Sequence, residues 1–236
     1  MKKIETIMLA FLVAGAATAE AQDRVEVSFG GDIVSSYVWR GIELGGMSLQ
    51  PSFSVGYKGL SLGAWGSTGI SDPADTKELD LTLAYSAGGL NIGVTDYWFN
   101  AGPDLDNRYF NYRCGCTNHV YEANVGYDFG FASLQWFTNF AGNDGVNKDG
   151  SFAYSSYVEM AVPFSLGGVD CTAVMGAVPF ATDFYGTEGF GVTNMALTAS
   201  KDIIVTESFS IPVFAQVSAN PYTGAAFLVL GFTFQP

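Results

Sequence analysis

Hydrophobic and polar residues alternate along almost the whole chain after residue 24. In the first stretch, one face carries Val25, Val27, Phe29, Ile33, Tyr37 and Trp39, and the other carries Arg24, Glu26, Ser28, Asp32, Ser36 and Arg40. A period of two residues is typical of a β-strand with one apolar face. The pattern recurs between turns rich in Gly, Asn and Asp, so it predicts an all-β protein.

We count twelve strands, an even number. Ten or fourteen stay open, because residues 190–205 and the longer connectors are hard to assign. The expected strands are residues 24–40, 49–57, 60–67, 78–86, 90–99, 120–129, 133–140, 151–165, 169–180, 190–205, 209–217 and 226–234.

The connectors between these strands alternate in length. "KG", "AGG", "FG" and "LGG" are tight, and the intervening connectors are longer and rich in Asp, Asn, Gly and Pro. Tight turns on one side and long loops on the other indicate a transmembrane antiparallel up-and-down β-barrel. Aromatic residues gather near the strand ends on the long-loop side, where we expect a membrane girdle. Its predicted members include Tyr37, Trp39, Trp98 and Trp136.

The composition separates the barrel from a secreted β-sandwich, whose core would be made by the same apolar faces. Charged residues are only 14% of the chain, against about 25% in soluble domains. After the N-terminal segment, no stretch approaches the ~20 apolar residues of a membrane helix. The barrel is therefore favoured, with apolar side chains toward lipid and polar ones toward the lumen.

The N-terminus has the order of a secretory signal peptide. Lys2 and Lys3 precede an apolar run at residues 7–17, and small residues follow up to Ala21. The apolar run is too short for a membrane anchor. No cysteine follows the cleavage region, so we do not expect a lipoprotein. We expect residues 1–21 to be removed and residues 22–236 to form the barrel in the outer membrane of a Gram-negative bacterium.

Charge and residue types limit the chemistry. The net charge of −13 excludes a basic nucleic-acid surface and docking on anionic lipid by charge. No serine is spaced to pair with His119, the single histidine, so we expect neither an enzyme nor a cofactor.

Two loops invite a metal interpretation. "CGCTNH" offers Cys114, Cys116 and His119, but a local disulfide, loop thiols or involvement of Cys171 are open alternatives, and we assign no metal. "NDGVNKDG" hints at calcium, but it lacks the acidic ladder of a calcium loop and contains ordinary turn formers.

Charged residues on the predicted inner face form the candidate functional site. They are Asp32, Arg40, Asp80, Glu122 and Glu159. In an open lumen the acids would concentrate cations; in a narrow one they would pair with basic residues such as Arg40 and plug it. Aromatic residues at inward positions, Trp65, Phe214 and Phe227, favour a narrow or plugged lumen.

Residues 35–67, "SSYVWRGIELGGMSLQPSFSVGYKGLSLGAWGS", resemble the TorF-type porins, a bacterial outer-membrane family. The matching motifs are the Ser-x-Tyr-x-x-Arg-Gly element at residues 36–41, "QPSFSVGY" and "GAW". "ELDLTLAYS", "LNIGVTDYWF" and "HVYEANVGY" resemble the strands that follow in that family. The resemblance implies an outer-membrane barrel with a transport role.

We therefore expect a porin for passive transport of small solutes with a bias toward cations, in contact with outer-membrane lipid. The alternative is a non-conducting structural or surface-binding barrel. A third version, a conduit for hydrophobic molecules like OmpW, would need a lateral apolar gap in the wall.

Overall fold

The computed structural model describes residues 24–72, 75–100, 108–113, 116–206 and 209–235. They form a closed antiparallel barrel of twelve strands and, apart from it, a two-stranded hairpin. The barrel order is β1-β14-β13-β12-β11-β10-β9-β8-β7-β6-β5-β4, with β4 returning to β1. The predicted all-β barrel of twelve strands is confirmed. The predicted signal peptide, residues 1–21, lies outside the described residues.

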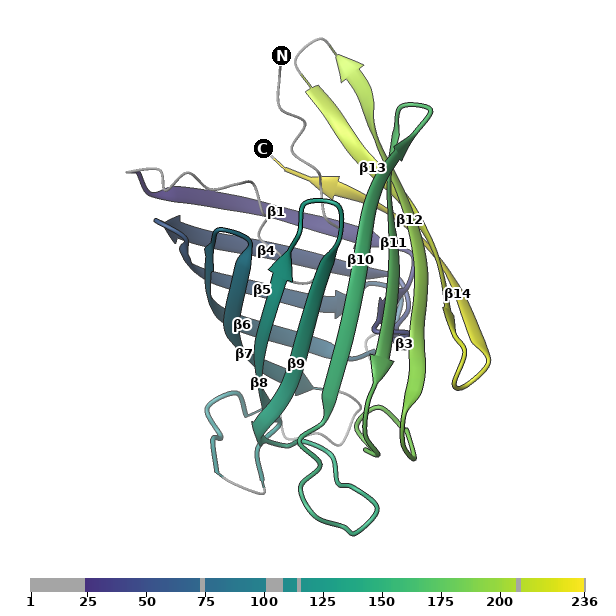
Figure 1. Cartoon of the computed structure of the whole chain (residues 1–236). Coiled ribbons are helices and arrows are strands. Elements are labelled where there is room, and N and C mark those ends of the chain that lie inside the picture. The colour runs from purple at the N-terminus through teal and green to yellow at the C-terminus, as the bar shows by residue number, and fades with distance from the viewer. Residues whose placement is uncertain (1–23, 73–74, 101–107, 114–115, 207–208, 236) are drawn as a thin grey trace.

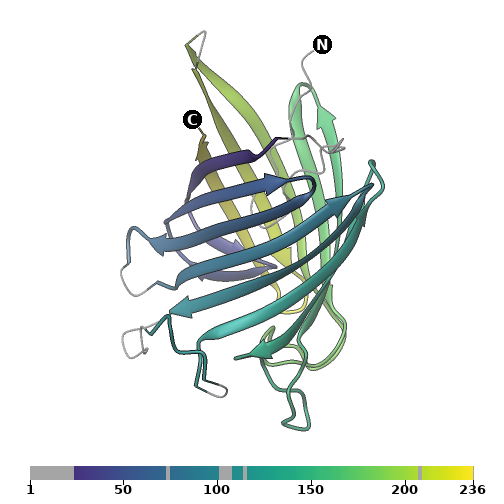
Figure 2. The same ribbon diagram turned by 90° about the vertical axis from the view of Figure 1, so that its left-hand side faces the viewer.

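The strands of the barrel are tilted relative to the barrel axis (Figure 2). Their bounds are β1 (Glu26–Val34), β4 (Ser48–Tyr57), β5 (Leu60–Gly69), β6 (Lys77–Ala87), β7 (Leu90–Asn100), β8 (His119–Asp128), β9 (Ser133–Gly142), β10 (Ser156–Leu166), β11 (Val169–Val178), β12 (Gly191–Thr206), β13 (Phe209–Asn220) and β14 (Ala225–Phe234). No helix in the described part of the chain is long and apolar enough to cross a membrane.

The side-chain alternation gives the barrel an apolar exterior and a polar interior. Phe29 and Leu228 are each 60% exposed on the outer surface, whereas Asp80 and Glu122 are 1% and 2% exposed. A β-sandwich would bury the apolar faces, so that alternative is wrong. An apolar exterior around a polar interior is the polarity typical of barrels that lie in a membrane.

The two ends of the barrel differ. Tight turns at residues 58–59, 88–89 and 167–168 have both central residues at positive φ. Such type I′ geometry suits two-residue hairpins and favours glycine. Longer connectors join the strands at the opposite end. Figure 1 shows the tight β10–β11 turn at one end of the barrel and the loop at residues 143–155 at the other.

The stretch predicted as one strand, residues 24–40, is divided. β1 ends at Val34, and the chain then forms the hairpin β2 (Tyr37–Trp39) and β3 (Ile42–Gly45). Arg40 and Gly41 make its turn with φ of 48° and 80°. A Cβ on Gly41 would lie 1.8 Å from the carbonyl oxygen of Thr193, so only glycine fits there.

The opposite polarity of the two faces predicts opposite tolerance to charge. Leu81→Arg places a cation on the outer surface at the middle of β6, and we expect it to lower the free energy of unfolding in lipid vesicles by about 2–4 kcal/mol. Ser54→Arg, which faces the lumen from β4, should cost far less. Urea titration followed by heat-modifiable gel migration measures both, and equal losses would contradict the assigned faces.

Candidate functional site

The β2–β3 hairpin lies inside the ring of strands and contacts its wall on three sides. The Tyr37 hydroxyl donates to Glu78 Oε2 on β6 at 2.7 Å. Asn220 Nδ2 on β13 donates to the carbonyl oxygen of Gly41 at 3.1 Å. Arg40, at the hairpin turn, contacts Glu122 on β8. The hairpin therefore spans the lumen.

The pair of Arg40 and Glu122 is the central interaction of the site. Arg40 Nη1 lies 2.6 Å from Glu122 Oε2, and Nη2 lies 2.9 Å from Oε1. Nη1 also donates to the Tyr185 hydroxyl, and the Tyr97 hydroxyl donates to Glu122 Oε1 at 2.9 Å. A buried bidentate pair with further hydrogen bonds is strong and directional. The pair holds the hairpin turn against β8 of the barrel wall.

Aromatic rings surround the guanidinium group. Arg40 Cζ lies 4.2 Å from the centroid of Phe137, 4.5 Å from Trp39 and 4.6 Å from Tyr157. Cation–π contacts are strongest where water is excluded. The sequence placed Arg40 on a polar inner face, but did not indicate that aromatic rings would enclose it.

A collar of buried side chains surrounds the hairpin at the long-loop end. Its buried members are Tyr37, Trp39, Tyr97, Val120, Tyr157, Val178 and Tyr185. They come from β2, β7, β8, β10, β11 and the β11–β12 connector. Burial raises the pKa of Tyr185 above its usual range, so this loop hydroxyl keeps its proton. The collar and the hairpin together fill this end of the lumen.

Among the described residues, Arg40 is the one buried lysine or arginine, and the buried carboxyl groups outnumber it. Glu78 and Asp80 face inward from β6, and Glu159 accepts a hydrogen bond from the Tyr157 hydroxyl at 2.9 Å. Both carboxyl oxygens of Asp80 lack a hydrogen-bond partner among the described residues. Since Arg40 is bound to Glu122, the interior around β6 contains more carboxyl groups than basic groups to pair with them.

Smaller residues line the lumen between the collar and the tight turns. Serines and glycines predominate at these inward positions, as their register shows. They include Ser28, Ser52, Ser54, Ser61, Gly63 and Ser86. A second buried apolar cluster, formed by Val34, Phe214 and Val229, also faces the lumen, so the lumen is polar in part and is closed at the long-loop end by the collar.

All five residues predicted to line the lumen lie inside the barrel. Asp32 accepts a hydrogen bond from the Thr233 hydroxyl at 2.6 Å, across the β1–β14 pair. Asp80, Glu122 and Glu159 face inward from β6, β8 and β10. Arg40 reaches the lumen from the hairpin turn, and not from a strand of the wall.

Two of the predicted girdle residues need correction. Tyr37 and Trp39 are buried in the collar and do not lie on the membrane-facing surface. The chain leaves the wall after Val34, so the alternation of residues 24–40 does not continue on one sheet face. Trp136 does lie on the outer surface, 38% exposed. Trp98 lies on the same side of the wall and packs against Tyr109, with ring centroids 5.5 Å apart.

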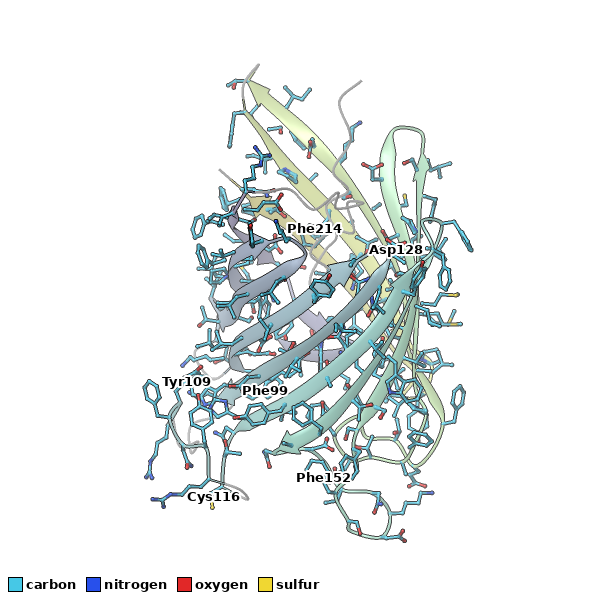
Figure 3. The ribbon with its side chains drawn as sticks, turned by 60° about the vertical axis from the view of Figure 1, so that its left-hand side comes forward. Phe99, Tyr109, Cys116, Asp128, Phe152 and Phe214 are labelled. Carbon is cyan, nitrogen blue, oxygen red and sulfur yellow. The ribbon has the colours of Figure 1, made fainter. Side chains whose placement is uncertain are left out.

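His119 lies on the outer side of the wall under the β7–β8 connector, and it is fully buried. Its Nδ1 is 2.7 Å from Asp96 Oδ1, its Nε2 is 2.6 Å from the Tyr109 carbonyl oxygen, and the Tyr112 ring stacks on it. Both ring nitrogens are thus engaged, which disfavours metal binding. Figure 3 shows Tyr109 and Cys116 in this connector. Cys114 lies outside the described residues.

The loop considered for calcium is an ordinary turn. Asn147 Oδ1 accepts from the backbone N–H groups of Asp149 and Ser151 at 2.9 and 3.1 Å. Asp144 accepts from Asn139 Nδ2 and the backbone N–H of Ser155, both at 2.9 Å. These carboxyl and amide oxygens stabilise the loop itself.

Comparison with known proteins gives a family and a general likeness. A family model described as "Bacterial protein of unknown function (Gcw_chp)" matches residues 18–212. No curated protein matches the chain in sequence.

Two solved structures are similar in outline. One is described as "Unveiling the Mechanism Behind the in-meso Crystallization of Membrane Proteins"; it has a TM-score of 0.41 and 9% identity, covering 89% of this chain and 83% of that one. The other is "Salmonella typhi OmpF complex with Daunomycin", with a TM-score of 0.37 and 9% identity, covering 91% of this chain and 98% of that one. Likenesses this distant carry no argument about function.

The Arg40–Glu122 pair predicts a strongly coupled double-mutant cycle. Arg40→Met or Glu122→Gln alone should lower the free energy of unfolding by about 3–5 kcal/mol, because each leaves a buried group without its partner. The double variant should lose less than the sum, with a coupling of about 0.5–3 kcal/mol. Urea unfolding in detergent micelles measures the cycle. The exposed pair Lys148–Glu188, at 3.9 Å, is the control, and we expect Lys148→Met and Glu188→Gln to show almost no coupling.

Proposed function

We propose that this chain, which belongs to the Gcw_chp family of bacterial proteins of unknown function, is an outer-membrane barrel with a narrow passage for small solutes and a bias toward cations. The β2–β3 hairpin closes that passage in the conformation described above. Solutes pass when the hairpin is displaced. No residue of the lumen has a catalytic role in this proposal.

The barrel surface supports the membrane location. The closed barrel pairs each strand with two neighbours and so satisfies most of the backbone internally, which favours a location in hydrocarbon. Outward side chains along the strands are apolar, and Tyr57, Tyr85 and Tyr127 lie near the tight turns with their rings exposed. Tyrosine favours the boundary between headgroups and hydrocarbon.

The way the hairpin is held carries the gating proposal. Its contacts with the wall include hydrogen bonds and an ion pair, from Tyr37, Arg40 and Gly41. These polar contacts can be exchanged for water, although displacement of the hairpin must also separate Tyr37 and Trp39 from the aromatic rings of the collar. The ion pair between Arg40 and Glu122 can also control release of the hairpin. Loss of either partner removes the charged contact that holds the hairpin turn to the wall.

The excess of acid supports the cation bias. When the hairpin leaves, Arg40 leaves with it, and Glu78, Asp80, Glu122 and Glu159 remain on the wall. Rings of carboxylates in a pore raise the local concentration of cations. The non-conducting barrel is the second candidate, and the completeness of the collar favours it.

Planar-bilayer conductance separates the two candidates. We expect brief, infrequent openings from the wild-type protein. Glu122→Gln should increase the open probability by about tenfold or more, since the hairpin loses its charged partner and about 1.4 kcal/mol corresponds to a factor of ten. Glu188→Gln, in an exposed loop, is the control and should behave like the wild type. Silence of all three proteins at every voltage would establish the non-conducting barrel instead.

The charge of the open passage can be tested in the Glu122→Gln background. Adding Asp80→Asn should move the reversal potential in a salt gradient toward zero, because one carboxylate fewer lines the passage. Adding Glu188→Gln should leave it in place. An unchanged reversal potential in the Asp80 variant would exclude Asp80 from the conducting path.

A further inference from the structure

The closure of the barrel between β1 and β14 is short. β1 pairs with β4 over nine residues, from Glu26 to Val34, but with β14 over only four, from Gly31 to Val34. β14 ends at Phe234, opposite Gly31. The edge of β1 that faces β14 therefore has no neighbouring strand along residues 26–30 in the described part of the chain.

The same shortfall exists on the other side of β14. β13 begins at Phe209, but its pairing with β14 begins only at Val213. Residues 209–212 pair with β12 alone among the described residues. Two strand edges, 26–30 and 209–212, thus border a gap in the wall on the side of the tight turns.

A cavity of about 460 Å³ fills this gap. Its lining includes Phe29, Leu49, Phe209 and Phe234 from the outer apolar face, and Ser210 and Thr233 at strand positions that alternate toward the lumen. The cavity therefore lies within the wall, between residues of its two faces. Its volume lies within the ~300–1,000 Å³ of small-ligand pockets.

We propose that this gap, which we name the seam cavity, is a lateral binding site for the alkyl chain of a single-chain amphiphile taken from the membrane. The proposal rests on the outer-membrane location proposed above, but not on conduction through the lumen. Unpaired strand edges in hydrocarbon are costly, and they persist only where a polar group or the lumen satisfies them. An amphiphile would cover the apolar part of the gap with its chain, among the phenylalanines, and would place its polar head on the lumen side.

The lining of the cavity selects the head group. None of its lining residues in the described part of the chain is charged, and Ser210 and Thr233 supply its side-chain hydroxyl groups. A charged head would lose hydration there without gaining an ion-pair partner. The amphiphile that fits has an uncharged head with a hydroxyl, as a long-chain alcohol or a monoacylglycerol has, and a fatty-acid anion fits less well.

A photoreactive alcohol tests the site directly. The full-length mature barrel is placed in nanodiscs, and a diazirine-bearing hexadecanol is added at low mole fraction and activated. We expect adducts concentrated on Phe29, Phe209 and Phe234, identified by mass spectrometry and removed by excess unlabelled hexadecanol. A diazirine-bearing palmitate should label these positions less. Adducts spread over outward residues of the whole wall, with no competition, would show only annular lipid and overturn the proposal.

A matched pair of variants locates the site independently. Leu49→Trp fills the outer part of the seam cavity, and we expect it to weaken competed labelling by about tenfold in apparent affinity, which is about 1.4 kcal/mol. Leu62→Trp makes the same change on an outward position of β5 and should have no effect. Heat-modifiable migration first verifies that both variants fold. The labelling result on the wild-type protein does not depend on either variant.

The remaining outcomes also decide the question. A second copy paired through the free edge of β1 would give a dimer in light scattering and no competed adduct, and this would refute the amphiphile. Competed labelling with no conductance in any variant would retain the seam cavity and reject the channel. A barrel that stays soluble without detergent would reject the membrane location, and the seam cavity with it.

Discussion

The arrangement of the lumen depends on one buried ion pair, between Arg40 and Glu122. An isolated charge in this position would be very costly, because the surrounding aromatic rings exclude water. The bidentate geometry, the hydroxyl groups of Tyr97 and Tyr185 and the faces of three rings together compensate for that cost. The pair therefore does more than stabilise the barrel: it determines where the hairpin lies.

The position of the hairpin makes the two ends of the barrel unequal. Toward the long loops, large aromatic residues fill the lumen around the hairpin. Toward the tight turns, serine and glycine occupy many of the inward positions. A passive porin needs a continuous wet path, and the collar interrupts one. Under the proposed function, the barrel conducts only when the hairpin leaves Glu122 and the collar opens.

The hairpin and the seam cavity arise at opposite ends of β1. The chain turns inward after Val34 to form the hairpin, whereas residues 26–30 lack a neighbour because β14 ends at Phe234, opposite Gly31. Closing the barrel with so short a contact leaves an edge that must be covered in hydrocarbon. The plug of the lumen and the lateral gap therefore have separate structural causes, the inward turn after Val34 and the early end of β14.

The sequence alone determined the barrel, its twelve strands and the inward placement of Asp32, Asp80, Glu122 and Glu159. Those features follow from a local period of two and from turn chemistry, which neighbouring residues encode. It also contained the signal for the hairpin, since Arg40-Gly41 resembles the turn at Lys58-Gly59. That signal was hidden because the alternation of apolar residues continued through it.

Only the tertiary structure decided what Arg40, Tyr37 and Trp39 contact. Arg40 meets a residue 82 positions later in the chain and Tyr185 145 positions later. Alternation reports which face of a strand a side chain occupies, but not whether that strand stays in the wall or crosses the lumen. The lateral gap was likewise decided by the lengths of pairing between the first strand and the last, which no local pattern records.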